Sequence, residues 1–386
     1  MTMEDNKTWS EWSIIGGGIA GLTAAIALER AGITATLFEA ADSWKEVGAG
    51  IALAPNAMAA LARLGVEAEV ITAGNPLQSF SILDEGGRCI TKTDLRRLHQ
   101  QFGHENLTIH RADLQGILLN NIVETTLIMG KRAIALSSTG EEQALTFADG
   151  TRHLTRYLIV ADGIHSPIRQ QLIPGSVPRY AGYTCWRGIA DNTQLQCKDT
   201  SETWAPGGRF GIVPLKQNRT YWFACVNGPK ADPFFRSCQL EDLHRIFRNY
   251  HAPVRELLLR TPPENLVWGD IMDLAPLDRF AFGNIVLIGD AAHATTPNMG
   301  QGACMAIEDG ELLGALLSER IPSDAFILFE DKRLKRTRNV VTQSRRIGRM
   351  AQCNRPFLVR SRNTLMRLLP ARMNEIQLKR AYGEIR

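Results

Sequence analysis

One stretch of this 386-residue chain gathers residue types that do chemistry into a single turn. GDAAHATTPNMGQG runs from Gly289 to Gly302, between an apolar run that reads as a buried strand and a segment that reads as a helix. It contains an acid, Asp290, an imidazole, His293, and a proline, Pro297. A glycine-rich turn before a helix offers free N–H groups and a partial positive charge to an anionic ligand. The stretch therefore predicts a ligand-binding turn.

A second glycine-rich turn lies near the N-terminus. Residues 13–39 read as strand, tight turn, helix and strand, and the turn, from Gly16 to Gly21, fits GxGxxG. Gly16 makes the turn, Gly18 lets a pyrophosphate approach the backbone, and Gly21 allows close packing of helix and strand. Glu39 ends the next strand, where a carboxylate accepts hydrogen bonds from ribose hydroxyls. The motif predicts a dinucleotide site, but it does not distinguish FAD from NAD.

A third motif, YLIVADGIHSPIRQQL, covers residues 157–172. Its buried strand ends at Asp162 and Gly163, and a helix that carries Arg169 follows. This is the same design as the stretch at Gly289: a strand, an acid, a glycine and a helix.

The order GxGxxG, DGxxSxxR and GDxxHxxxPxxGxG resembles the group A FAD-dependent monooxygenases, the para-hydroxybenzoate hydroxylase-like family, from about residue 13 to 370. The resemblance implies an α/β fold. A Rossmann-like FAD-binding domain of the glutathione-reductase type carries an inserted β-sheet substrate lobe and C-terminal helices. The expected bounds are 1–75, 100–179 and 276–330 for the discontinuous FAD domain, 76–99 and 180–275 for the lobe, and 331–386 for the helices.

The resemblance also assigns residues to FAD. Because FAD is long, one turn takes its pyrophosphate and the other its ribityl chain and flavin, where a helix N-terminus stabilises negative charge at N1 of the reduced ring. His293 is expected to brace its turn rather than to act as a general base. The expected contacts are Gly16, Gly18, Ile19, Ala20 and Gly21 with the pyrophosphate, Glu39 and Ala40 with the adenosine ribose, Arg111 with the phosphates or ribose, Gly48, Gly50 and Ile51 along the flavin, Asp162 and Gly163 with FAD and the nicotinamide cofactor, Gly289 and Asp290 with the ribityl side, Gly300, Gln301, Gly302 and Ala303 with the N1 edge, and Pro297 over the ring.

Between Arg179 and Asp270 the pattern changes to strands rich in aromatic residues, which suits a sheet above a largely apolar pocket. Local segments resemble the branch that contains bacterial FAD-dependent urate hydroxylase, and GYTCWRGIAD is similar to zeaxanthin epoxidase. Carried over, Arg209 positions an anionic heterocycle and Tyr221 holds its ring. Two alternatives stay open: Arg209 as an exposed hairpin residue, and Tyr221 as a core aromatic residue.

The resemblance implies a monooxygenase that hydroxylates or epoxidises a small aromatic, heterocyclic or polyene substrate through a flavin C4a-hydroperoxide. NADH or NADPH binds transiently as electron donor, dioxygen is the co-substrate, and no metal is needed. The alternatives are an oxidase or reductase without oxygen insertion, and a non-enzymatic flavin-binding protein. A flavin halogenase is disfavoured because no WxWxIP-like segment is present.

Composition sets broader bounds. The seven cysteines include no CxxC pair, the start is polar, and no apolar run is long enough to span a membrane, so we expect a cytoplasmic protein without a membrane span. We expect no binding to nucleic acid, and the sequence leaves both a monomer and a homodimer open. From residue 330 onward, 16 Lys and Arg stand against 4 Asp and Glu. Such a stretch can contact nucleic acid or an anionic membrane, but its helical spacing favours a solvated face packed against an acidic body.

Overall fold

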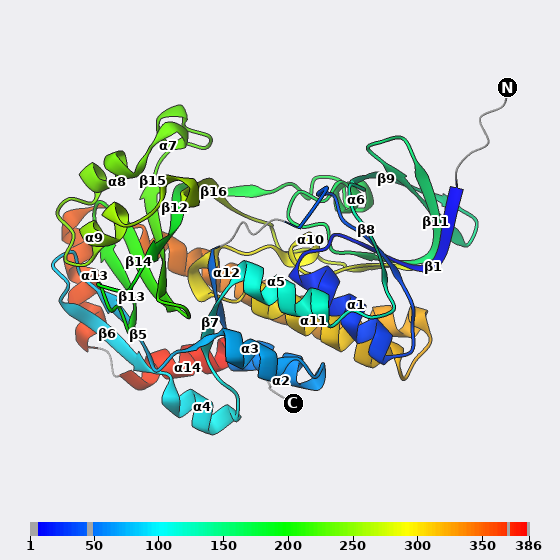
Figure 1. Ribbon diagram of the computed structural model, residues 1–386, viewed down its shortest axis with the longest axis horizontal. Coiled ribbons are helices and arrows are strands. Elements are labelled where there is room, and N and C mark those ends of the chain that lie inside the picture. The colour runs from blue at the N-terminus through cyan, green and yellow to red at the C-terminus, as the bar shows by residue number, and fades with distance from the viewer. Residues whose placement is uncertain (1–6, 45–48, 369–370, 384–386) are drawn as a thin grey trace.

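The computed structural model describes residues 7–44, 49–368 and 371–383. Its first sheet has eight strands, of which β18, β11, β1, β2 and β8 are adjacent and parallel, with β8 at one edge (Figure 1). In spatial order the strands are β17 (Ala281–Phe282), β18 (Ile285–Leu287), β11 (Arg152–Val160), β1 (Lys7–Ile15), β2 (Thr36–Phe38) and β8 (Thr126–Ile128), with β10 (Glu142–Phe147) and β9 (Ala133–Thr139) continuing from β11. A parallel sheet with helical crossovers confirms the predicted α/β class.

The helices beside this sheet are held unusually close together. Helix α11 (Gly302–Leu317) runs along α1 (Ile19–Arg30), and α5 (Arg111–Asn120) also packs against α1 (Figure 1). A Cβ built on Gly310 would lie 2.7 Å from the backbone N of Ala24, and one on Gly314 would lie 2.7 Å from the backbone O of Ala27. Two glycines four residues apart on one helix face therefore let the two backbones touch.

A second sheet of seven strands forms the lobe at the left of Figure 1. In spatial order it comprises β16 (Val267–Asp273), β12 (Arg179–Asp191), β15 (Arg219–Asn227), β14 (Gly208–Leu215), β13 (Thr200–Ala205), β5 (Ser79–Leu83) and β6 (Cys89–Asp94). These strands come from, or begin one residue before, the two segments expected to form the lobe. The domain boundaries themselves remain a prediction.

One face of this second sheet is a hydrophobic core. Trp186, Phe210 and Trp222 are fully buried and pack against Leu243 and Leu257 of the covering helices. Those helices are α7 (Pro233–Ser237), α8 (Leu240–Ile246), α9 (Val254–Leu259) and the 3-10 turn η1 (Pro263–Asn265). Because side chains alternate along a strand, the residues between these core positions, such as Arg187 and Tyr221, lie on the other face of the sheet, away from the covering helices.

Short elements join the two sheets. A three-stranded sheet, β3-β7-β4, lies between them and carries α2 to α4 at its side. The bounds are β3 (Gly50–Leu53), β4 (Asn75–Pro76), β7 (Leu107–His110), α2 (Pro55–Arg63), α3 (Glu67–Ala73), α4 (Arg96–Phe102), α6 (Pro167–Leu172), α10 (Asp290–His293) and the 3-10 turn η2 (Pro297–Met299). The Thr108 hydroxyl of β7 donates to the backbone O of Pro214 in β14 at 2.6 Å, which ties the junction together.

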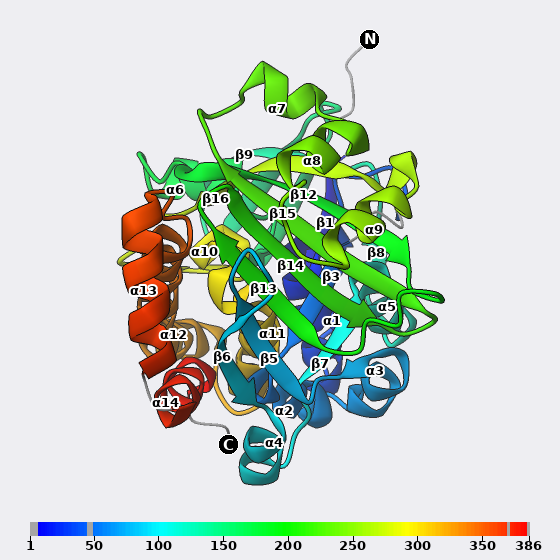
Figure 2. The same cartoon turned by 90° about the vertical axis from the view of Figure 1, so that its left-hand side faces the viewer.

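The C-terminal helices follow the edge of the lobe. They are α12 (Pro322–Ala351), α13 (Pro356–Leu368) and α14 (Ala371–Tyr382), which lie along one side of the molecule in Figure 2. Helix α12 begins at Pro322, a favourable first-turn position for proline, and runs continuously through the boundary expected at residue 330. None of the helices in the described parts of the chain is both long and apolar enough to cross a membrane.

The contact between α1 and α11 makes a testable prediction. Gly310→Ala should lower the free energy of unfolding by up to about 2 kcal/mol, because overpacking costs about 1–3 kcal/mol and better helix propensity returns about 1. Gly116→Ala in α5 is the matched control, since a Cβ there meets nothing within 4 Å. Chemical denaturation should show a loss at Gly310 and no loss at Gly116; equal effects would mean that close helix packing does not require Gly310.

Candidate active site

The three sequence motifs meet at one edge of the first sheet. β1, β11 and β18 are adjacent and parallel, with Ile15 opposite Val160 and Val160 opposite Leu287. Each strand leads directly into its motif: the Gly16 turn, Asp162 and Gly289 respectively. The carboxyl ends of parallel strands share an edge, and this is where open α/β sheets bind ligands.

The two glycine-rich turns lie against each other. Gly16 has φ +98° and a Cβ there would lie 2.4 Å from the backbone O of Ala161, while Gly289 has φ +57° and its Cβ would lie 2.6 Å from the Cβ of Ala20. A Cβ on Gly21 would lie 1.9 Å from the backbone O of Gly16. By contrast, a Cβ on Gly18 would meet nothing within 4 Å, so open space borders the N-terminus of α1 at the position expected for the pyrophosphate.

Glu39 connects the first turn to the end of β2. One carboxylate oxygen accepts a hydrogen bond from the backbone N–H of Gly17 at 2.6 Å and the other from that of Ala41 at 2.8 Å. Each oxygen keeps lone-pair capacity for a ribose hydroxyl. Ala40 lies between Glu39 and Ala41 in this turn.

Arg111 is exposed and begins α5, and its backbone N–H donates to the O of Ala49 at 3.1 Å, next to β3. Gly50 and Ile51 begin β3, and Gly48 lies outside the described residues. The Arg111 charge also acts on Asp290, whose carboxyl pKa is raised by burial and lowered in part by His293 and Arg111. Asp290 nevertheless remains accessible to solvent. A carboxylate that is both surrounded by protein and accessible is suited to a ligand hydroxyl.

Asp162 supplies a direct test of whether a cofactor fits. Both of its carboxylate oxygens are buried, and neither has a hydrogen-bond partner among the described residues. Burial raises the carboxyl pKa to about 6, while the nearby Ser166 hydroxyl and the charge of Arg169 act in the opposite direction. Next to it, Gly163 has φ +85° and faces open space. An unpartnered buried carboxylate is costly, so this one fits a ligand that brings hydroxyl donors, as FAD does.

A buried charge cluster holds the Gly289 turn in place. Asp309 of α11 accepts the Gly289 N–H at 2.8 Å, contacts His293 Nε2 at 2.6 Å and pairs with Arg333 of α12 at 2.6 Å. Burial alone raises the pKa of Asp309, but the charges of Arg333 and His293 more than offset this and lower it. His293 is thus built into the turn, in agreement with the bracing role expected for it.

The remaining residues of this turn sit at the start of α11. Pro297 and Gly300 are accessible, and Gly300 has φ +63°. The Gln301 side chain is buried and accepts a hydrogen bond from Asn56 at 3.1 Å. Gly302 and Ala303 open the helix, whose first N–H groups have no intrahelical acceptor. These free N–H groups are the ones expected to meet the N1 edge of the flavin.

The second face of the seven-stranded sheet turns toward these motifs. Tyr221 of β15 is buried and packs on β3, since a Cβ on Gly50 would lie 2.7 Å from its Cδ1. The Tyr183 hydroxyl of β12 donates to Asn298 Oδ1 at 3.2 Å, beside Pro297. Residues from the lobe therefore contact both β3, at a glycine expected to line the flavin, and the Gly289–Gly302 turn.

Arg209 lies on this face but is not an exposed hairpin residue. It is buried, its Nη1 donates to Glu202 at 2.9 Å and its Nε to Gln352 at 3.2 Å. Its guanidinium also lies 5.1 Å from the ring centroid of Tyr183. The Glu202 carboxylate already neutralises the charge of Arg209, which leaves less positive charge for an anionic substrate. Contact between Arg209 and substrate remains a prediction.

Sequence reasoning missed Arg187. It lies on β12 between Cys185 and Ile189 and shares the face of Tyr221, Phe223 and Cys225, its neighbours on β15. Arg187 is half-buried and interacts with the Cys185 thiol and the Tyr221 hydroxyl, and no carboxylate of the described residues forms an ion pair with it. Its place in WRG next to a fully buried tryptophan was the only signal: strand alternation puts it on the opposite face from Trp186.

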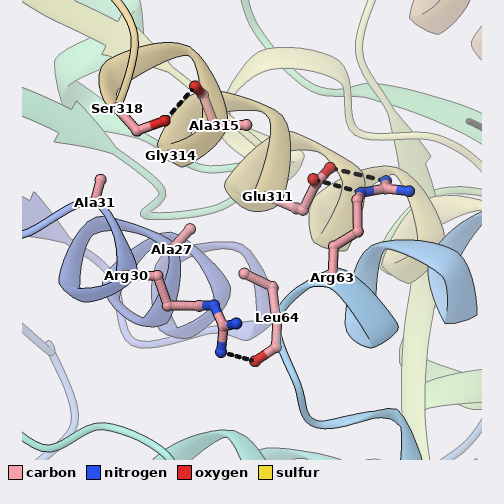
Figure 3. A pocket seen from close by; sticks show the side chains of 9 residues that line it. All are labelled: Ala27, Arg30, Ala31, Arg63, Leu64, Glu311, Gly314, Ala315 and Ser318. Carbon is pink, nitrogen blue, oxygen red and sulfur yellow. Dashed lines mark hydrogen bonds and ion pairs between the residues drawn. The ribbon is translucent and has the colours of Figure 1, made fainter.

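A separate pocket of about 110 Å³ lies at the far ends of α1 and α11 (Figure 3). Arg63 pairs with Glu311 at 2.6 Å, and Arg30 donates to the backbone O of Leu64 at 3.0 Å across it. Because its guanidinium groups are already engaged and it lies away from the motif turns, we assign it no ligand.

Comparison with known proteins agrees with this geometry. The family described as "FAD binding domain" matches residues 10–344. Aurachin C monooxygenase/isomerase from Stigmatella aurantiaca is 38% identical over 94% of this chain and 95% of its own, and the FAD-dependent urate hydroxylase of Klebsiella pneumoniae is 33% identical over 86% and 88%. The crystal structure of K. pneumoniae HpxO with FAD and uric acid superposes with a TM-score of 0.89 at 29% identity, covering 96% of both chains.

Asp162→Asn should stabilise the apoprotein and at the same time weaken FAD binding. The carboxyl pKa of Asp162 is raised from 3.8 to about 6 in the folded protein. The buried charge therefore lowers the free energy of unfolding of the apoprotein by its full amount above about pH 6 and not at all below about pH 4. The variant apoprotein should therefore gain up to about 3 kcal/mol at pH 8, and the gain should vanish as the pH falls to 4.

The same variant should bind FAD about tenfold or more weakly, because a hydrogen bond to a charged group is lost. Thermal melts of apoprotein across pH and FAD titration by fluorescence measure the two effects. Tighter FAD binding, or a gain in stability independent of pH, would contradict a ligand role for this carboxylate.

Proposed function

This chain belongs to the FAD binding domain family and is a FAD-dependent monooxygenase, and from that premise we propose that it uses NADH or NADPH and dioxygen to hydroxylate a small planar aromatic or heteroaromatic substrate. The single observation that supports this most is the contact of one sheet face with both segments expected to border the flavin, through Tyr221 on Gly50 of β3 and Tyr183 on Asn298 of the Gly289–Gly302 turn. A substrate on that face lies beside the flavin.

Arg187 is the residue that we assign to substrate orientation. A half-buried guanidinium without a carboxylate partner favours an electronegative group of the ligand, such as a carbonyl or an oxyanion. Uric acid, the molecule bound to HpxO, is a planar heterocycle with carbonyl groups and acidic N–H groups. A ring of that kind would satisfy Arg187 in this chain.

The chemistry divides between cofactor and protein. FAD, when bound and reduced by NADH or NADPH, supplies activated dioxygen, of which one atom enters the substrate and the other leaves as water. The protein orients the ring: Arg187 stabilises a substrate oxyanion, which lowers the pKa of the substrate hydroxyl and makes the ring carbon a better nucleophile. Tyr221 offers its ring face, and burial raises the pKa of its hydroxyl against the Arg187 charge, so this hydroxyl stays protonated as a donor.

Pro297 and the apolar part of the sheet face serve to exclude water. Proline has no N–H that could donate a hydrogen bond to a neighbouring oxygen atom or to water, and Phe223 lies next to Tyr221, with ring centroids 6.1 Å apart. A dry site keeps reduced oxygen from being lost as hydrogen peroxide.

The proposal is tested by NADH and NADPH oxidation with the FAD-loaded protein across a substrate panel, with hydrogen peroxide measured in parallel. Urate, hydroxybenzoates, indoles and a quinolone form the panel. We expect at least one compound to accelerate oxidation without equal peroxide and to gain one atom from ¹⁸O₂. If all acceleration appears as peroxide, the protein is an oxidase and the proposal is wrong.

Arg187→Met should raise KM for an acidic substrate about tenfold or more, in keeping with the loss of a hydrogen bond to a charged group. Arg187→Lys should recover part of the loss only at high pH, where the substrate itself ionises. Arg248→Met, at an exposed position of the same lobe, is the control. Steady-state kinetics with unchanged KM and an unchanged pH profile would remove Arg187 from the site.

A further inference from the structure

An exposed apolar stripe runs along α13. Phe357, Leu365 and Leu368 are 78%, 61% and 77% exposed, and Leu358 is 46% exposed. Phe357 and Leu365 are 8 residues apart, Leu365 and Leu368 are 3 apart, and Leu358 directly follows Phe357. At about 100° per residue, this spacing places all four within about a third of the helix circumference. The opposite side of α13 is buried through Val359 and Asn363, so the stripe faces away from the lobe. Large exposed apolar patches of this kind mark interaction sites.

Basic side chains accompany the stripe. Arg355 and Arg360 are exposed beside it, and Arg346 and Arg349 are exposed in the last two turns of α12, with Met350 43% exposed among them. None of these four arginines has a carboxylate partner among the described residues. We name these four arginines, Met350 and the stripe the α13 surface.

The two helices of the α13 surface are fixed to each other. Arg362 Nη1 donates to the backbone O of Met350 at 2.8 Å and of Ala351 at 3.2 Å. Its guanidinium also lies 5.1 Å from the ring centroid of Trp204 in the lobe. Figure 2 shows α13 at the outer edge of the molecule, with no element beyond it in that view. The surface is therefore a rigid and accessible face.

We propose that the α13 surface docks on an anionic lipid surface. Apolar side chains enter the headgroup boundary, while arginines at the rim pair with lipid phosphates and keep their charge in water. A second copy of this chain fits less well, because a twofold contact would bring four unpaired arginines against four more. The inference is independent of the oxygenation chemistry, since it uses none of the residues of the active site.

Sedimentation with vesicles tests this with the FAD-loaded protein. We expect binding to vesicles of mixed phosphatidylcholine and phosphatidylglycerol, and much weaker binding to pure phosphatidylcholine or in high salt. Each of Arg355→Gln and Arg360→Gln should weaken partitioning about fivefold. Phe357→Ser and Leu365→Ser should each weaken it about tenfold or more.

Matched controls come from exposed positions elsewhere. Ile327 is 64% exposed near the start of α12, more than 20 residues along the helix from Met350, and Arg248 is exposed on α8's side of the lobe. Ile327→Ser and Arg248→Gln should bind vesicles like the natural chain. Flavin content and melting temperature of every variant show that it is folded.

Three results would overturn the proposal. The first is the absence of binding to anionic vesicles. The second is binding that survives loss of Phe357 and Leu365 but not of the arginines, which indicates a soluble polyanion. The third is a dimer by light scattering that Phe357→Ser dissociates, which assigns the surface to a second copy of this chain.

Discussion

The candidate site depends on one buried carboxylate, that of Asp309. It holds the N–H of Gly289, the ring of His293 and the guanidinium of Arg333, so it joins the end of β18, α11 and α12 at one point. A buried charge is tolerated only when it is compensated, and removing one partner of a buried pair costs about 3–5 kcal/mol. The Gly289 backbone is therefore fixed by buried groups on the α11 side of the turn, while the neighbouring Asp290 stays accessible to a ligand.

Close backbone contact fixes the position of helices α1 and α11 relative to each other, as Asp309 fixes the Gly289 turn. Gly310 and Gly314 let α11 touch α1, so the N-termini of both helices are set at the same sheet edge. Both helix dipoles then direct partial positive charge toward one region, which suits a cofactor with a pyrophosphate at one end and a flavin that becomes anionic at the other. The lobe completes the enclosure through Tyr221 and Tyr183.

The strand-turn-helix motifs of the cofactor side can be predicted from the sequence because each motif is local. A glycine turn, its strand and its helix are adjacent in the chain, so the Gly16 and Gly289 turns follow from spacing alone. The substrate side depends on partners far apart in sequence: Arg209 meets Glu202 and Gln352, and no pattern near Arg209 indicates this. The basic C-terminal stretch was expected to pack on an acidic body, and part of it does, through Arg333–Asp309, Arg336–Glu308, Arg338–Asp278, Arg345–Asp273 and Arg367–Asp84. Four arginines that lack such partners among the described residues, Arg346, Arg349, Arg355 and Arg360, gather at the α13 surface, which only tertiary structure could reveal.

The charged groups that lack a matching partner in the protein lie on the two sides of the candidate site. Arg209 and Asp309 are buried charges with oppositely charged partners in the protein, whereas among the described residues the Asp162 carboxylate oxygens have no hydrogen-bond partner and Arg187 has no carboxylate partner. Asp162 accepts hydrogen bonds and lies with the FAD-side turns; Arg187 donates them and lies on the lobe. A fold that leaves an acceptor on one wall and a donor on the other is suited to two ligands, one rich in hydroxyl donors and one bearing an oxyanion or carbonyl. The ligands that satisfy these groups are also those that a flavin hydroxylation requires, so the stability given up by the empty protein is recovered when the reaction complex forms.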